Sequence, residues 1–510
     1  MKYLANAGKA NYIDRLSTEK YLIPSIVLME RAAYETAKVI MNDGDSDSLE
    51  NVLVVAGNGN NGGDAIAVGR ILHENGYNVN IFFIGSSGSM TEQTELQYNI
   101  ASVSGVEFIE GAEPYGDVFS GYDIIIDGIF GVGLSRDVSG KYADIIDSMN
   151  ESQSKIYSID IPSGINASTG QVMKTAVMAD HTVTYGLLKT GLALYCGREY
   201  AGKVSVKDIG FPCGAVQDAD IREFFFERPD MDRLPVRKSL SNKGTYGKVL
   251  VIAGGMGMSG AAFMSAKAAY RSGCGLVKVL TCSKNVPTIS CMLPEAIVSG
   301  IDWEDYASVR EVIGREISWA DAAVLGPGLG TDRMACEIVK AVLQSGTCSI
   351  VVDADAVNII SSDENRDIRK LYSDNLERII ITPHLKEMSR LSGDDIGTMR
   401  EDMSGYVMKY CSENEGVVLI LKDSCTLVGD GQTVYFNMSG NDAMATGGSG
   451  DVLTGIAASF MAQGLDRYDA ACMSVYVHGL AGDDACKRLN RYSVMAGDII
   501  ESLCNVLIKE

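Results

Sequence analysis

Residues 52–64 read VLVVAGNGNNGGD, a run of aliphatic, mostly β-branched residues that passes directly into a glycine-rich loop. A helical pattern follows from Ala65 to Asn75, and a second aliphatic run extends from Val79 to Ile84. Short β-branched runs that alternate with helical patterns predict parallel strands joined by crossover helices. We therefore expect an α/β fold.

The same alternation continues along the chain and is interrupted once, between Phe211 and Leu240, by prolines and charged residues. A chain of 510 residues is also too long for one ordinary core, since domains usually hold about 100 to 200 residues. We predict a Rossmann-like three-layer αβα domain at residues 1–217 and a second α/β domain at residues 228–510. The other predicted strands are 124–126, 156–159, 249–252, 322–325, 349–352 and 379–381.

Two features are predicted near the N-terminus. Apolar residues at helical spacing between Asn11 and Met41 predict one or two helices, and a polar loop follows from Asn42 to Glu50. This loop carries alternating aspartates, but Ser48 stands where an EF-hand calcium loop needs glycine. We predict a solvated acidic turn there.

The composition excludes several classes of function. The formal net charge is −22 with scattered basic residues, which disfavours nucleic acids and anionic membranes as partners. The twelve cysteines include no Cys-x-x-Cys pair, and we interpret them as small, reduced core residues. The N-terminus has no apolar export segment, and the longest uncharged run, Val249 to Ala266, is broken by four glycines. We expect a cytoplasmic protein with no membrane span.

The first glycine loop satisfies Gly-x-Gly-x-x-Gly, which alone is weak evidence for a dinucleotide site. A dehydrogenase also places an acidic residue at the end of the next strand, and residues 81–86 contain none. Two later strand ends carry Asp127 and Asp160, and ligands in open α/β sheets lie beyond the carboxyl ends of strands. Oxygen atoms of these loops could bind a cation, or the aspartates could cap the helices that follow.

The C-terminal half has a pattern typical of anion binding. Residues 445–451 read ATGGSGD and precede a helix whose predicted apolar face is Val452, Leu453, Ile456 and Phe460. Backbone amides at a helix N-terminus, together with the helix dipole, cradle phosphate groups. Asp451 beside them suits a base for phosphoryl transfer. The alternative interpretation is a plain helix start with a capping aspartate.

The loops of the first half resemble the NAD(P)H-hydrate epimerase family through residues 60–64 (NNGGD), 127–133 (DGIFGVG) and 160–164 (DIPSG). This family interconverts the C6 epimers of hydrated NADH and NADPH. The resemblance implies that Asp160 is the acid/base group and that K⁺ is bound by Asn61, Asp127 and Ser163. The implied contacts to the hydrated dinucleotide are Asn60, Asn61, Gly62, Gly63, Asp64, Gly131, Val132, Gly133, Leu134, Ser135, Arg136, Asp137 and Asp160.

The second half resembles the NAD(P)H-hydrate dehydratase branch of the ribokinase-like fold, through residues 326–330 (GPGLG), 353–358 (DADAVN), 382–384 (TPH) and the Gly-Asp motif. That branch uses ADP or ATP to phosphorylate the C6 hydroxyl group, after which phosphate departs. Asp451 would be the base, and we expect Mg²⁺ from the phosphate chemistry. The implied substrate contacts are Ala261, Gly328, His384 and Asp451, and the implied nucleotide contacts are Lys422, Asp423, Ser424, Cys425, Thr426, Asn441, Thr446, Gly447, Gly448, Ser449 and Gly450.

The two resemblances together predict one bifunctional repair enzyme that epimerises hydrated NAD(P)H and dehydrates the S form. The pairing makes chemical sense, because a dehydratase that accepts only one epimer would leave the other epimer unrepaired. The alternative is a vitamin or sugar kinase fused to a non-catalytic nucleotide-binding module. We expect small-molecule partners and a homo-oligomer. The sequence does not decide whether the enzyme prefers ADP or ATP, or whether it prefers hydrated NADH or hydrated NADPH.

Overall fold

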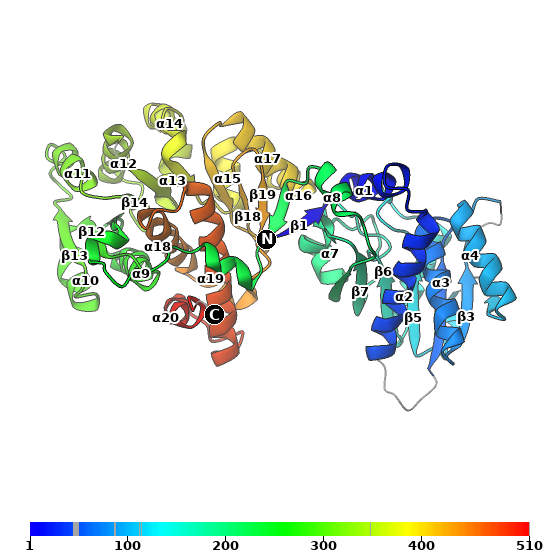
Figure 1. Ribbon diagram of the computed structural model, residues 1–510. Helices are drawn as coiled ribbons and strands as arrows, with labels where there is room; N and C mark the ends of the chain where they lie inside the picture. Colours follow the sequence, from blue (N-terminus) through cyan, green and yellow to red (C-terminus); the bar gives the residue numbers. More distant parts are fainter. Residues whose placement is uncertain (44–49, 86–87, 112, 114, 347, 509–510) are drawn as a thin grey trace. The chain divides into compact units, whose positions relative to one another are not determined.

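The computed structural model describes residues 1–43, 50–85, 88–111, 113, 115–346 and 348–508 (Figure 1). It divides into two compact units, Tyr3–Glu223 and Phe224–Glu510, and the second also includes Met1–Lys2. The amino group of Met1 pairs with Asp230 at 2.6 Å, which attaches the first residues to the C-terminal unit. The acidic turn expected between Asp43 and Glu50 lies outside the described residues.

A parallel sheet forms the centre of the N-terminal unit, with the order β4-β3-β2-β5-β6-β7-β9 among the described residues. Alternate residues of its strand β2 point to opposite faces, so Val52 and Val54 pack with α2 and α3 while Leu53 and Val55 pack with α5. The unit therefore has the expected three layers, helix, sheet and helix.

The helices of this unit are α1 (Ala7–Glu19), α2 (Ser25–Asp43), α3 (Asn60–Glu74), α4 (Glu92–Val103), α5 (Lys141–Glu151), α6 (Thr190–Ala193), α7 (Tyr195–Tyr200) and α8 (Cys213–Asp218). Its strands are β2 (Asn51–Ala56), β3 (Asn78–Phe83), β4 (Glu107–Ile109), β5 (Ile124–Gly128), β6 (Lys155–Ile159), β7 (His181–Tyr185), β8 (Leu188–Lys189) and β9 (Lys203–Lys207). Strands β1 (Lys2–Ala5) and β10 (Glu223–Phe225) fall where the two units divide.

The C-terminal unit is built on a second sheet, whose strands follow the order β13-β12-β11-β14-β15-β16-β17-β18-β19. The pairs from β13 to β17 are parallel, and the last two pairs are antiparallel. Helices α9, α18, α19 and α20 share a core with one face of this sheet, and Figure 1 shows α11, α12 and α14 on the other side. This mixed sheet between helix layers is the α/β fold expected for the second half.

The strands of this unit are β11 (Lys248–Ile252), β12 (Leu276–Cys282), β13 (Ile297–Ile301), β14 (Ala322–Leu325), β15 (Ser349–Val352), β16 (Ile379–Ile381), β17 (Val418–Leu421), β18 (Leu427–Gly429) and β19 (Val434–Phe436). Its helices are α9 (Ser259–Arg271), α10 (Val286–Met292), α11 (Val309–Ile317), α12 (Arg333–Ser345), α13 (Asp355–Ser361), α14 (Arg366–Ser373), α15 (Leu385–Ser392), α16 (Ile396–Glu401), α17 (Met403–Glu413), α18 (Ser449–Ala462), α19 (Arg467–Leu489) and α20 (Ala496–Val506).

Each sheet has a point where the strand order reverses. In the N-terminal unit β2 lies between β3 and β5, and in the C-terminal unit β11 lies between β12 and β14. The loops that leave two neighbouring strands at such a point run to opposite sides, and the crevice between them is the usual ligand site of open α/β sheets. The fold thus offers one site in each unit.

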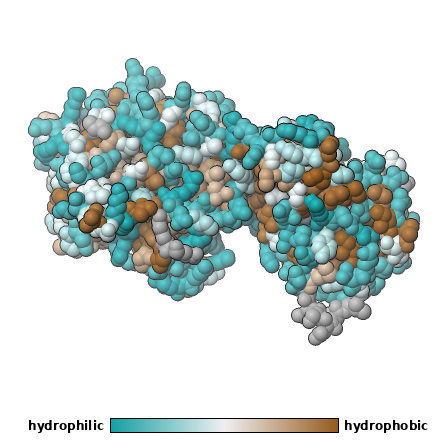
Figure 2. Space-filling model, viewed as in Figure 1, coloured by the Kyte–Doolittle hydropathy of each residue, from teal (hydrophilic) through white to brown (hydrophobic). Residues whose placement is uncertain are grey.

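Three further expectations can be compared with the structure. The N-terminal segment forms two helices, and α18 is buried on nearly every side rather than along one apolar face. None of the twelve cysteines forms a disulfide bond, but Cys213, Cys291 and Cys504 are exposed, so the assignment of the cysteines to the core was wrong for these three. No helix in the described part of the chain is long and apolar enough to cross a membrane. Hydrophilic residues cover most of the face of the C-terminal unit drawn in Figure 2.

Candidate active sites

A cavity of about 940 Å³ opens at the point where the order of the first sheet reverses. That volume lies in the range of small-molecule and cofactor sites, roughly 300 to 1,000 Å³. The structure brings most of the residues expected to bind the dinucleotide to its wall, namely Asn60, Asn61, Asp64, Asp160 and all seven residues from Gly131 to Asp137.

Gly62 and Gly63 are the two expected contacts that do not line the cavity. A side chain at Gly62 would lie 2.0 Å from the carbonyl oxygen of Gly57, so glycine there permits the tight turn between β2 and α3. A side chain at Gly63 would meet Thr94 and Met29 at about 2.8 and 2.9 Å. These glycines shape the loop and allow Asn60, Asn61 and Asp64 to reach the cavity.

Asp160 follows β6 and faces the cavity in a left-handed backbone conformation, with φ of 62°, which is uncommon outside glycine. Its carboxylate oxygen Oδ1 accepts hydrogen bonds from Thr184 Oγ1 at 2.9 Å and from the Tyr185 amide at 3.2 Å. The same oxygen pairs with the ammonium group of Lys189 at 2.5 Å. Three contacts of this kind, with the backbone strain, fix the direction of one carboxylate.

Lys189 is a site residue that the sequence did not reveal. Its side chain is 5% exposed, and besides Asp160 it donates to Thr184 Oγ1 and to the Tyr185 carbonyl, both at 3.0 Å. A buried lysine held by three acceptors is expensive to desolvate and is kept where its charge has a use. The available signal was a lysine at the end of a short strand, which is too common to single out.

Two more carboxyl groups share the cavity with Asp160. Asp64 comes from α3 and Asp14 from α1, and burial followed by repulsion from Asp160 raises the pKa of both carboxyl groups. The pKa of Asp64 is raised well above its ordinary value, with Asp14 adding to the effect and Lys189 opposing it. Carboxyl groups brought this close in a buried site hold a proton among them. Asp14 was not predicted, because α1 lies far from the other residues in the sequence.

Asp127, Ser163 and Asn61, the expected potassium ligands, lie together behind the cavity wall. The Asp127 carboxylate is fully buried and accepts hydrogen bonds from the Ser163 hydroxyl at 2.5 Å, the Ser163 amide at 2.8 Å and the Ser158 hydroxyl at 2.8 Å. Burial raises the pKa of Asp127, and these hydrogen bonds oppose the effect. The side chains of Asn61 and Ser163 both donate to the carbonyl oxygen of Phe130, at 3.0 and 3.2 Å.

The second site lies at the N-terminus of α18. Gly448 begins the helix with φ of 90°, a conformation that favours glycine, and the first amides of a helix have no partner within it. The side chain of Ser449 contacts Nε2 of the buried His478 at 3.3 Å. A side chain at Gly447 would meet nothing within 4 Å, so this nest of amides is open to a ligand.

Asp451 lies in the first turn of α18 beside these amides. Burial and then the neighbouring Asp353 raise the pKa of its carboxyl group to about 7, with the Lys422 ammonium opposing the effect. A group that exchanges its proton near neutral pH is well matched to general base catalysis. Asp451 contributes its backbone carbonyl to the scaffold, where the hydroxyl group of Ser265 donates to it at 3.0 Å.

The loops after β11 and β14 form the other wall of this site. The Gly255 amide donates to the carbonyl of Gly328 at 2.6 Å, and a side chain at Gly328 would lie 2.9 Å from the methyl group of Ala261. Ala261 and Gly328, both expected substrate contacts, are therefore neighbours. Asp355 extends this wall by accepting a hydrogen bond from the Gly330 amide at 2.8 Å.

Three other expected contacts make hydrogen bonds within the protein. His384 begins α15, where its Nδ1 accepts from the Glu387 amide at 3.1 Å, and its side chain is 47% exposed. Asn441 donates to Asp483 at 2.7 Å and caps the short turn that follows it. Cys425 is buried, and its Sγ donates to the Asn437 carbonyl oxygen at 3.6 Å. Lys422, Asp423, Ser424 and Thr426 lie in the same connection between β17 and β18.

A strand-end cavity with clustered carboxyl groups, and a glycine-rich helix start beside another carboxyl group, are typical of an α/β enzyme that acts on nucleotides. Comparison with known proteins gives the particular family. The model for NAD(P)H-hydrate dehydratase matches residues 249–505, and that for the YjeF-related protein N-terminus matches residues 25–191.

Relatives match the chain over nearly its whole length. The bifunctional NAD(P)H-hydrate repair enzyme of Moorella thermoacetica is 33% identical, over 99% of this chain and 96% of its own. That of Thermofilum pendens is 33% identical, over 95% of this chain and 92% of its own. A solved ribokinase-like superfamily protein from Enterococcus faecalis is 30% identical and covers 56% of this chain and 95% of its own, with a TM-score of 0.48.

The chain belongs to the family of bifunctional NAD(P)H-hydrate repair enzymes. Both resemblances stated from the sequence motifs are confirmed, as is the fold class of a Rossmann-like unit followed by a ribokinase-like unit.

Proposed function

We propose that the N-terminal unit, with residues 1–217 as its domain, epimerises hydrated NADH and NADPH at C6, and that residues 228–510 dehydrate the S epimer. The observation that carries this proposal is the pair of carboxyl groups, Asp160 and Asp451, each placed at the carboxyl edge of its own sheet. Asp160 lines a cavity of cofactor size, and Asp451 adjoins a phosphate-binding helix start.

Epimerisation needs the C6 hydroxyl group to leave and return on the other face, or the ring to open and close, and either route moves a proton at oxygen. In the first route, water returns on the other face of the ring. The lone pair of the ring nitrogen expels the hydroxyl group, which needs a proton as it departs, and the incoming water must lose one. Asp160, which is paired with the Lys189 ammonium group, takes the proton from water. Asp64, whose pKa is raised by burial, donates the other proton. Loops 60–64 and 131–137 hold the dinucleotide.

Potassium fits the oxygens behind this cavity. The carboxylate of Asp127, the hydroxyl of Ser163 and the carbonyl of Phe130 are oxygen ligands already gathered within hydrogen-bonding distance of one another. The Asn61 amide now presents its nitrogen to Phe130, and turning the amide about its last side-chain bond places its oxygen there instead. A bound cation would neutralise Asp127 and fix the loop after β5 that lines the cavity.

Asp127→Asn is expected to lower repair of the R epimer about 10- to 100-fold and to remove its dependence on potassium, by analogy with the loss of an outer metal contact. The measurement is R-epimer turnover in potassium and in tetramethylammonium buffers. Ser158→Ala is the matched control, because it removes one hydrogen bond to the same carboxylate without removing a proposed ligand. Turnover of the unaltered protein that is equal in the two buffers would rule out the potassium site.

Dehydration begins with transfer of a phosphoryl group from ADP or ATP to the C6 hydroxyl oxygen of the S epimer. Asp451 takes the hydroxyl proton as the new bond to phosphorus forms, and the amides from Gly447 to Gly450 hold the phosphoryl oxygens. The ring nitrogen then expels phosphate from C6, and loss of a C5 proton restores the dihydronicotinamide. Ala261 and Gly328 contact the ring side, and the connection 422–426 contacts the nucleotide.

Magnesium is expected to accompany the nucleotide. The described residues contain no group of three or more histidine, cysteine, aspartate or glutamate side chains placed to hold a metal ion. This agrees with the usual behaviour of Mg²⁺, which binds through one or two carboxylates together with substrate phosphates. Asp353 and Asp355 are the carboxylates nearest to Asp451 that could supply such a contact.

The pH dependence of dehydration tests the base. Because burial raises the pKa of Asp451 to about 7, kcat/KM is expected to rise with pH up to neutrality and to level off above it. Below the pKa it should fall about tenfold for each pH unit, as one proton blocks the base. The nearby His478 does not contribute to this limb, since burial lowers its pKa to about 4. A profile that stays flat between about pH 5 and 8 would contradict the assignment.

The overall function is tested by supplying hydrated NADH with ADP or ATP and following the absorbance of the reduced ring. Recovery of NADH from both epimers supports a bifunctional repair enzyme. Recovery from the S epimer alone would leave the N-terminal unit without its proposed activity. A stable phosphorylated product without recovery of the ring would favour the kinase alternative.

A further inference from the structure

Lys422, one of the expected nucleotide contacts, forms a largely buried ion pair with Asp353 in the C-terminal unit. The ammonium group of Lys422, just after β17, lies 2.6 Å from Oδ1 of Asp353, just after β15. The Asp353 side chain is 2% exposed and that of Lys422 is 21% exposed. Two charges removed this far from water are costly to keep, and such pairs are weak sources of stability. Stability therefore does not explain why the protein keeps this pair, whereas a chemical role would.

The pair faces the phosphate-binding end of α18. A side-chain carbon placed on Gly450 would lie 3.4 Å from the Lys422 nitrogen and 3.5 Å from Oδ2 of Asp353. Glycine at this position leaves the space between the ammonium group and the helix open. The pair also acts electrostatically on this end of the helix, because Asp353 raises and Lys422 lowers the pKa of Asp451.

The backbone around both residues is fixed. The Lys422 amide donates to the Pro383 carbonyl at 2.9 Å, and the Asp353 amide donates to the Leu325 carbonyl at 3.1 Å. Ala354, next to Asp353, has φ of 51°, a strained conformation for a residue with a side chain. The ammonium group is thus held at one point beside Gly450, at the N-terminal end of α18.

We propose that Lys422 is a catalytic residue of the dehydratase, whose ammonium group bonds the phosphoryl group in transfer, and that Asp353 is the positioning residue that aims it. The proposal rests on the proposed dehydratase function. As the C6 hydroxyl oxygen bonds to phosphorus, the bond from phosphorus to the bridging oxygen of the nucleotide breaks, and its electron pair leaves with the shortened nucleotide. The hydroxyl proton goes to Asp451, and Lys422 offsets the negative charge on the phosphoryl oxygens without exchanging a proton.

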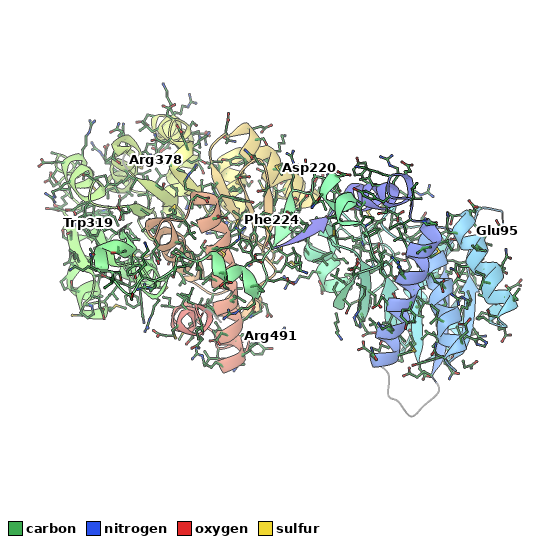
Figure 3. All side chains as sticks on the ribbon, in the orientation of Figure 1. Glu95, Asp220, Phe224, Trp319, Arg378 and Arg491 are labelled. Carbon is green, nitrogen blue, oxygen red and sulfur yellow. The ribbon has the colours of Figure 1, made fainter. Side chains whose placement is uncertain are left out.

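The matched control is another buried lysine pair in the same unit. Lys278 lies 2.7 Å from Glu316, with side chains 15% and 8% exposed. Lys278 lies on β12, and four strands separate β12 from β17 in the sheet. The Lys278 nitrogen is 4.4 Å from the ring centre of Trp319, which is labelled in Figure 3. Loss of this pair reports the cost of removing a buried lysine without touching the proposed centre.

The experiment measures dehydration of the S epimer with ADP and with ATP in Lys422→Met, Lys422→Arg, Asp353→Asn and Lys278→Met. Lys422→Met is expected to lower kcat about 10²- to 10³-fold with little change in the KM for the hydrated cofactor, as for loss of one transition-state donor. Lys422→Arg should recover at least about tenfold of that loss, since its charge remains. Asp353→Asn should lower kcat less than Lys422→Met and also leave KM in place, whereas Lys278→Met should turn over normally.

Near-normal kcat in Lys422→Met would overturn the proposal, and so would equal losses in the methionine and arginine variants. If Lys422→Met does not fold, the Lys422→Arg and Asp353→Asn variants provide the test. The proposal requires that both variants have a lower kcat at constant KM. It is overturned if both variants show only a higher KM. Epimerisation of the R form in the same chains checks that each variant is intact. Failure of the unaltered protein to dehydrate the S epimer would instead refute the proposed function itself.

Discussion

Asp160→Asn is expected to lower repair of the R epimer by about 10²- to 10⁴-fold, the contribution usual for a positioned acid or base. An amide cannot take the proton that water loses as it returns to C6. Dehydration of the S epimer should be unchanged, because Asp451 and the amides of α18 belong to the other unit. The measurement follows NADH recovery separately from the purified R and S epimers in the presence of ADP.

The matched control for this variant is Asp123→Asn. Asp123 lies at the opposite, amino end of β5 and accepts a backbone hydrogen bond from Asn51 at 2.8 Å. The substitution Asp123→Asn removes a carboxylate from the same sheet without changing the cavity. Normal repair of the R epimer by Asp160→Asn would remove Asp160 from its proposed role, and equal losses in both variants would show that the effect is structural.

Asp451→Asn is expected to stop dehydration to a similar extent, about 10²- to 10⁴-fold, while epimerisation of the R form continues. Without a base, the C6 hydroxyl group keeps its proton, and attack on phosphorus is slow. The pH dependence expected near neutrality in the unaltered protein should disappear from the residual activity, because Asp451 is the group proposed to produce it. Interconversion of the two epimers, followed chromatographically, provides the second readout.

Asp321→Asn serves as the control in this unit. Asp321 precedes β14 and accepts a hydrogen bond from the Lys248 amide at 2.9 Å, at the end of the sheet opposite to Asp451. Dehydration should be retained in it. A full rate in Asp451→Asn would mean that another group, such as Asp353, takes the proton.

Much of the fold could be predicted because its signals are local. The strands at 52–55, 124–126, 156–159, 249–252 and 322–325 were found from their β-branched runs, and each lies inside an observed strand. Strands β7, β9, β17 and the antiparallel pair β18 and β19 were not predicted, although β17 is a continuous aliphatic run. Their place in the sheet depends on partners far away in the sequence.

The residues of the candidate sites also divide into those that a local sequence pattern predicts and those that it does not. The motifs placed Asp127 and Asp160 at strand ends, and Asp64 and Asp451 in the first turns of helices, close to where ligands of α/β sheets bind. The end of a strand and the start of a helix are both local features of the sequence. The motif could not distinguish Gly62 and Gly63, which form the turn, from Asn60 and Asn61, which reach the cavity. Nor could it show that His384 begins a helix by capping it.

By itself the sequence determined the alternation of strands and helices, the two glycine-rich loops and the membership of the family, because each follows from residues that are neighbours along the chain. Only the tertiary structure decided which distant charges meet: Asp14 and Lys189 in the cavity of Asp160, Lys422 and Asp353 beside Asp451, and Met1 on Asp230. The physical reason is that an ion pair depends on the distance between two side chains in space, and that distance is set by the order of the strands in the sheet.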